Sequence, residues 1–117
     1  MWIMLKDAFF SIVDKADKAG CLVVRARRQG DIERYFPQAK VQKTVGNDYL
    51  FRAEIPREDV AERIAQCVMD NTAPNFKNSV TDRKLHTAYN RIWHVMADLQ
   101  PVPPFSSGRN RRQGSLL

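Results

Sequence analysis

The chain has 117 residues, of which 44% are hydrophobic, so we expect one domain with a single modest core. Lys and Arg number 19 against 13 Asp and Glu, which gives a formal charge of +6. No apolar run has the length of a membrane span, and Lys6 interrupts the apolar start too early for a signal peptide. We therefore expect a cytoplasmic protein outside the membrane, with a domain over residues 1–100 and a flexible tail over residues 101–117.

The first two apolar segments, residues 2–5 and 8–14, are rich in β-forming side chains and are separated by a short break, which predicts a hairpin. Both segments are apolar on both faces, whereas a strand with one solvated face alternates. Either another part of the chain covers the second face, or this face mediates self-association, for example in a homodimer. The residues of such a self-association surface would be Trp2, Met4, Phe9 and Phe10.

The middle of the chain predicts three more strands and a short helix. Residues 21–27 follow a polar turn and are expected to be extended, and a helix over residues 31–36 is stopped by Pro37. Residues 40–45 and 49–55 alternate on either side of the turn at residues 46–48, which predicts a second hairpin. In the last of these strands, Tyr49, Phe51, Ala53 and Ile55 are expected to face the helices.

Two longer helices complete the predicted fold. Pro56 is suited to open the first of them, and Ser79 is expected to cap the second, which runs to about Leu99. The resulting order is β-β-β-α-β-β-α-α. It predicts an α+β fold with a five-stranded antiparallel sheet, a variant of the ferredoxin-like arrangement with its helices on one face.

Arginines give the best indication of a partner. Arg25, Arg27 and Arg52 are expected on the sheet face opposite the helices, and Arg28 follows the strand directly. Because a planar guanidinium can donate two parallel hydrogen bonds to a phosphate or a carboxylate, these residues are candidates for binding nucleic acid or an acidic protein surface. The alternative is a solvated face on which they pair with Glu54, Asp14 or Asp31.

The tail adds a second basic element that consists of Arg109, Arg111 and Arg112. It is either an arm that attracts polyanions or a disordered solubilising end. Without these three arginines, residues 1–108 carry a formal charge of +3. The arginines at 25–28 are therefore a local feature, suited to a few specific anionic contacts.

No residue pattern is typical of a catalytic, metal or cofactor site. His86 and His94 are eight residues apart, too far to share one metal ion on a helix, and Cys21 and Cys67 lack metal-ligand spacing. A small ribonuclease centred on His86 is a less favoured alternative. We therefore expect a non-enzymatic protein without cofactor or metal.

Two segments, MWIMLKDAFFSIVDK and NFKNSVTDRKLHTAYNRIW, also carry a resemblance. The first resembles, over residues 1–5, Asp7, Phe9 and residues 11–15, the opening of a set of short, largely uncharacterised bacterial proteins found in genomes and on phages and plasmids. The second continues the resemblance over residues 75–77, 79, 80, 82, 85, 86, 88, 89 and 93. It implies an accessory protein that binds a larger host machine, as anti-CRISPR inhibitors of bacterial defence do, and it assigns no functional residue.

The leading hypothesis is thus a small binding module that engages a nucleoprotein complex or its nucleic acid. A basic chain is not suited to mimic DNA, because a phosphate mimic is strongly negative. The alternatives are a self-associating structural or regulatory protein and, less favoured, the small ribonuclease.

Overall fold

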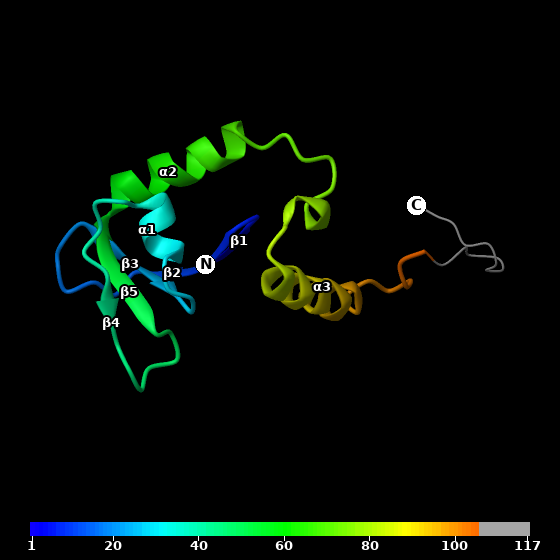
Figure 1. Cartoon of the computed structure of the whole chain (residues 1–117), viewed down its shortest axis with the longest axis horizontal. Helices are drawn as coiled ribbons and strands as arrows, with labels where there is room; N and C mark the ends of the chain where they lie inside the picture. Colours follow the sequence, from blue (N-terminus) through cyan, green and yellow to red (C-terminus); the bar gives the residue numbers. More distant parts are fainter. Residues whose placement is uncertain (106–117) are drawn as a thin grey trace. The chain divides into compact units, whose positions relative to one another are not determined.

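The computed structural model describes residues 1–105, and the elements follow the predicted order (Figure 1). The strands are β1 (Trp2–Leu5), β2 (Ala8–Val13), β3 (Cys21–Ala26), β4 (Gln42–Lys43) and β5 (Phe51–Pro56). The α-helices are α1 (Asp31–Tyr35), α2 (Arg57–Met69) and α3 (Arg83–Ala97), with a 3-10 turn at Lys77–Ser79.

The described chain forms two compact units, Met1–Ser79 and a second unit that begins at Val80. The domain expected over residues 1–100 extends over both units. The first unit contains the sheet, α1 and α2, and the second contains α3.

The sheet has the strand order β1-β2-β3-β5-β4, and every neighbouring pair is antiparallel. Because β5 lies between β3 and β4, the connection through α1 crosses over one strand, as in a ferredoxin-like fold. The leading hairpin adds β2 and β1 on the other side of β3. The predicted α+β fold with a five-stranded antiparallel sheet is therefore confirmed.

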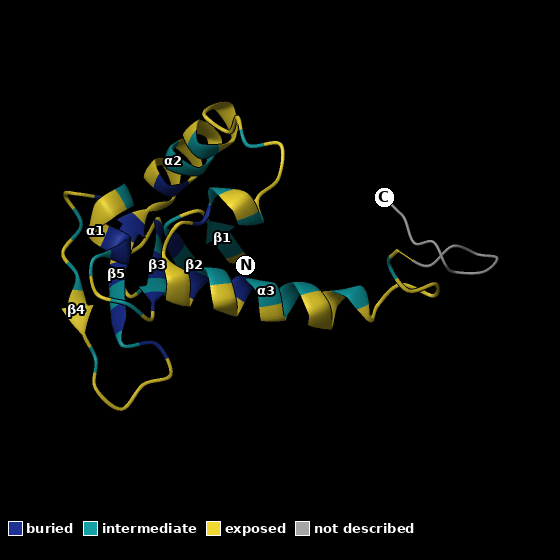
Figure 2. Cartoon of the chain, turned by 45° about the vertical axis from the view of Figure 1, so that its right-hand side comes forward, coloured by how far each residue is buried: buried dark blue, intermediate teal, exposed yellow. Residues whose placement is uncertain are grey.

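Helices α1 and α2 cover one face of this sheet, and their apolar side chains form the core with the strands (Figure 2). Alternation of the strand side chains sends every second residue into this core. The fully or almost fully buried members are Ala8, Phe10, Ile12, Val24, Ala26, Ile32, Phe36, Phe51, Ala53, Ile55 and Val60.

Phe10 lies inside this core and has no exposed surface. Its ring makes edge-on and tilted contacts with Tyr35 and Phe36 of the α1 segment, at centroid distances of 5.7 and 6.0 Å. The expectation that Phe10 belongs to a self-association surface is therefore wrong. The hairpin is apolar on both faces, and the sequence pattern did not reveal which face the helices cover.

Two predicted strand boundaries also differ from the structure. β4 contains only two residues, whereas alternation predicted a strand over residues 40–45. Preceding it, the backbone N–H of Ala39 donates to the carbonyl of Phe36 at 3.0 Å, so this segment turns instead of joining the ladder. β5 begins only at Phe51. Tyr49, which was expected to face the helices, is not a member of the core cluster beneath them.

The second unit begins with a capped helix. Asp82 is the N-cap of α3, because its carboxylate accepts the N–H of Leu85 at 2.9 Å. Ser79 was the predicted cap, but its hydroxyl donates to the carbonyl of Phe76 at 2.5 Å in the 3-10 turn. Leu85 and Tyr89 are the buried residues of α3. None of the helices within residues 1–105 is both long and apolar enough to span a membrane.

Candidate anion-binding site

A single row of side chains crosses the sheet on the face opposite to α1 and α2. The register pairs Ser11 with Trp2 and with Arg25, and it pairs Arg52 with Arg25 and with Gln42. Their chain neighbours Val24 and Ala53 point into the core, so alternation places the row on the other face. From β1 to β4 the row consists of Trp2, Ser11, Arg25, Arg52 and Gln42.

Two arginines of β3 and its extension are held by the ring of Tyr49. The guanidinium carbons of Arg25 and Arg27 lie 4.5 and 4.2 Å from the ring centroid. Nη2 of Arg25 also donates to Oγ of Ser11 at 2.6 Å, and Nη1 of Arg27 donates to the carbonyl of Asp48 at 2.7 Å. Cation–π contact and these hydrogen bonds fix both side chains in place. This role of Tyr49 was not predicted from the sequence. The signal that could have indicated it is the position of Tyr49 beside the arginine strand in the sheet.

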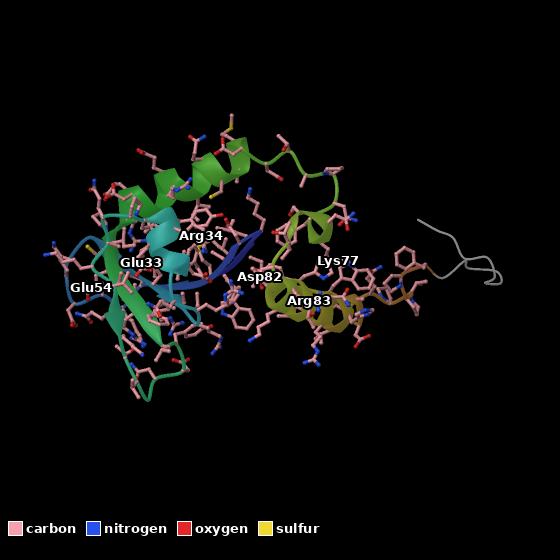
Figure 3. All side chains as sticks on the ribbon, viewed as in Figure 1. Glu33, Arg34, Glu54, Lys77, Asp82 and Arg83 are labelled. Atoms are coloured by element: carbon pink, nitrogen blue, oxygen red, sulfur yellow. The ribbon has the colours of Figure 1, made fainter. Side chains whose placement is uncertain are left out.

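The acidic residues that could neutralise these arginines are engaged elsewhere. The carboxylate of Glu54 accepts the backbone N–H groups of Asp17 and Lys18, at 2.7 and 3.2 Å (Figure 3 shows Glu54 on β5). Asp14 pairs with Arg57 at 3.3 Å. Within residues 1–105, no carboxylate forms an ion pair with Arg25, Arg27 or Arg52. The alternative in which the acids of this region neutralise the three arginines is therefore not realised.

Arg25 and Arg52 also retain buried donors without acceptors. Nε of each is inaccessible to solvent and has no hydrogen-bond partner in the described part of the chain. Leaving a buried donor unpaired costs about 1–3 kcal/mol. The two residues are directly opposed across β3 and β5, an arrangement that brings two like charges together. An anionic group bound at the two guanidinium groups would relieve the repulsion between them.

Arg28 belongs to a different cluster, at the start of α1. Its Nε lies 3.8 Å from Oδ1 of Asp31, whose side chain is only 2% exposed. Asp31 also contacts Nη1 of Arg34 at 3.3 Å and accepts the N–H of Phe9 at 3.3 Å. Burial raises the pKa of the Asp31 carboxyl, and the hydrogen bond from Phe9 and the two arginines partly counteract this. Arg28 thus pairs with Asp31, as the alternative interpretation predicted.

A tyrosine beside this cluster is held in its neutral form. The hydroxyl of Tyr35 donates to the carboxylate of Asp7, and burial together with this hydrogen bond raises the Tyr35 pKa. The guanidinium of Arg63 lies 4.8 Å from the centroid of the same ring. These contacts anchor α1 to the β1–β2 turn and to α2, and they are structural.

An exposed aromatic ring, that of Trp2, and a half-buried one, that of Phe9, lie on the arginine face at the β1 end. Trp2 is 69% exposed, and its ring contacts that of Phe9 edge-on at a centroid distance of 6.0 Å. Met4 lies opposite Phe9 in the register. Such rings are surfaces on which nucleobases stack.

The other candidates from the sequence are the tail arginines and His86. Arg109, Arg111 and Arg112 lie outside the described residues. His86 is half-buried on α3, and no group of three His, Cys, Asp or Glu side chains within residues 1–105 is arranged to hold a metal ion. Comparisons of the chain with protein-family models, curated proteins and solved structures gave no match.

Proposed function

We propose that the chain is a non-enzymatic binding module that engages the nucleic acid of a nucleoprotein complex. The observation that carries this proposal is the set of three arginines, Arg25, Arg27 and Arg52, that no carboxylate of residues 1–105 neutralises, the first two of them held in place by Tyr49 and hydrogen bonds. Their planar donors fit phosphate oxygens. A folded body that carries only +3 favours a few such contacts over broad attraction to any polyanion.

The row across the sheet supports a single strand as the ligand. Neighbouring strands are about 4.8 Å apart, so Trp2 on β1 and Arg25 on β3 are separated by roughly 10 Å. A strand that crosses the sheet can therefore place a base on Trp2 and a phosphate at Arg25 and Arg52. Stacking accepts any base, so we expect weak sequence preference.

The biological setting that we propose follows from the resemblance to accessory proteins of mobile elements. A small basic module that occupies the guide or target strand of a bacterial defence complex would inhibit it. An acidic protein patch of the same complex offers carboxylates in place of phosphates and is the other ligand that suits these arginines.

The test is fluorescence anisotropy with a labelled single-stranded oligonucleotide at several salt concentrations. We expect Arg27→Gln to weaken binding about tenfold and to reduce the salt slope by about 0.7, the value for one phosphate contact on a single strand. Arg91→Gln is the matched control, because Arg91 is exposed on α3 and the change in charge is the same. Equal losses in both variants would show that net charge, and not this site, controls binding.

Self-association is a second candidate, favoured by the edge of the sheet. β1 is an edge strand that carries the exposed Trp2 and the half-buried Met4. An unpaired edge with apolar side chains can pair with a second copy. Sedimentation across a hundredfold concentration range tests this, and a monomer throughout would reject it.

A further inference from the structure

A groove in the first unit runs beside the free part of β5, and we propose that it binds an extended peptide segment of a partner protein. The segment alternates acidic and apolar residues and adds to the sheet as a short strand. This inference goes beyond the proposed nucleic-acid binding and does not depend on it.

The edge of β5 is only partly paired. β5 pairs with β3 along its whole length, but with β4 only at Phe51 and Arg52. The N–H of Arg57 donates to the carbonyl of Gly20 at 2.9 Å, so Arg57 bonds toward β3. Because alternate residues of an antiparallel strand bond to opposite sides, residues 51, 53 and 55 also direct their backbone groups toward β3. Glu54 and Pro56 therefore direct theirs away from β3. Proline has no N–H, and as N-cap of α2 Pro56 uses its carbonyl for the first hydrogen bond of that helix, so the free edge offers the N–H and carbonyl of Glu54.

The groove exists because the chain before β4 leaves the ladder. The β4–β5 register, continued toward Pro56, would place residues 38–41 opposite residues 53–56. These residues form a turn after Phe36 instead of pairing with β5, as the hydrogen bond from Ala39 shows, and Ala39 and Val41 pack against the core. The whole groove has a volume of about 1020 Å³, which is at the upper end of the range for ligand sites.

The two sides of the groove differ in chemistry. On the side of the arginine face it is lined by Lys15, Asp17, Lys18 and Arg52. Glu54 lies on that side as well, but its carboxylate already accepts the N–H groups of Asp17 and Lys18. Three cationic side chains against two acidic ones leave this side with an excess of one positive charge, which favours carboxylate side chains.

On the helix side, the groove is lined by the apolar side chains of Phe36, Ala53 and Ile55. Asp59, Glu62 and Arg63 of α2 also line the groove and give it an excess of one negative charge next to the apolar residues. An added strand sends successive side chains to opposite faces of the sheet. The peptide that fits both sides thus alternates acidic and apolar residues.

The experiment is a titration of the ¹⁵N-labelled full chain with a blocked peptide, Asp-Val-Asp-Val-Asp, followed by amide chemical shifts. We expect saturable shifts centred on Glu54, Ile55 and Lys18. A peptide with Lys in place of Asp is expected to bind at least fivefold more weakly. N-methylation of the peptide amides that face β5 is expected to abolish binding, because it removes the donors of the added ladder.

Variants of the protein test the same edge. Glu54→Pro removes the outward N–H and is expected to abolish binding. The charge reversal Lys15→Glu with Lys18→Glu is expected to invert the preference between the Asp and Lys peptides. The N-methylated peptide tests the proposal on the unchanged protein if Glu54→Pro does not fold.

Three results would overturn the inference. Equal binding of the N-methylated and unmodified peptides would exclude strand addition, and shifts confined to residues outside the groove would place the peptide elsewhere. Shifts at Glu54 that depend on protein concentration without peptide would assign the edge to a second copy of the chain.

Discussion

Arg25 and Arg52 stand directly opposite each other on β3 and β5, and Nε of each is buried without a hydrogen-bond acceptor. Like charges opposed in this way destabilise a sheet by up to about 1 kcal/mol, and an unpaired buried donor adds to the cost. Such a pair is retained at the expense of stability. A binding role accounts for it, because a bound anion relieves the repulsion between the two charges.

Replacement of Arg52 by Met therefore separates stability from binding. Met keeps most of the apolar stem and removes both the charge and the unpaired Nε, so we expect the free energy of unfolding in urea to rise by about 0.5–1 kcal/mol. Binding to an oligonucleotide is expected to fall. Arg57→Met is the control: Arg57 pairs with Asp14, and its loss leaves stability unchanged or slightly lower. A clear loss of stability in Arg52→Met would mean that Arg52 has a structural role.

The buried carboxyl of Asp31 predicts a pH dependence of stability. Burial raises its pKa above the ordinary value of 3.8, so the folded chain still holds a proton at pH values where the unfolded chain has released it. The free energy of unfolding therefore falls as pH rises through the interval between the unfolded and the folded pKa. Relative to Asp31→Asn, which does not titrate, wild type is expected to lose stability across this interval. A gain would show that the ion pairs with Arg28 and Arg34 dominate over burial.

Glu54 is expected to order the loop that precedes β3. Its carboxylate accepts two backbone N–H groups, and hydrogen bonds to a charged group contribute about 1.5–3 kcal/mol at most, less at an exposed site. Glu54→Ala is expected to cost about 1 kcal/mol in unfolding free energy and to accelerate amide hydrogen exchange at Asp17 and Lys18. Glu54→Gln keeps one acceptor oxygen and is expected to show about half of each effect. Unchanged exchange at both amides would contradict this role.

Alternation and turn residues were sufficient to predict the five strands, their order and the face that carries Arg25, Arg27 and Arg52. These features depend on local chain geometry, which the sequence pattern specifies directly. The burial of Phe10 and the length of β4 could not be predicted in this way. The first depends on which face of a doubly apolar hairpin the helices cover, and the second on a turn after Phe36 that competes with strand pairing.

The candidate site was predicted only in outline. Alternation placed the arginines on one face, but the choice between a binding site and a neutralised surface depends on which groups the nearby acidic side chains contact. The carboxylate of Glu54 accepts backbone N–H groups of the loop before β3, and Arg28 forms an ion pair with Asp31. Neither contact follows from sequence spacing. Tyr49 was expected in the core because it continues the alternation of β5. It contacts the arginines because the regular strand begins only at Phe51.

The start of α3 offers a direct comparison between the predicted and the observed cap. Asp82 accepts the N–H of Leu85, and its carboxylate also complements the positive end of the helix (Figure 3). We expect Asp82→Ala to lower the free energy of unfolding by about 1 kcal/mol, a typical value for loss of an N-cap, and to reduce hydrogen-exchange protection in the first turn of α3. Ser79→Ala is the matched control: it removes a hydroxyl that bonds only within the 3-10 turn, so protection of the Leu85 and His86 amides is expected to stay as in wild type. If Ser79→Ala exposed these amides and Asp82→Ala did not, the helix would begin at Ser79, as the capping pattern in the sequence predicted.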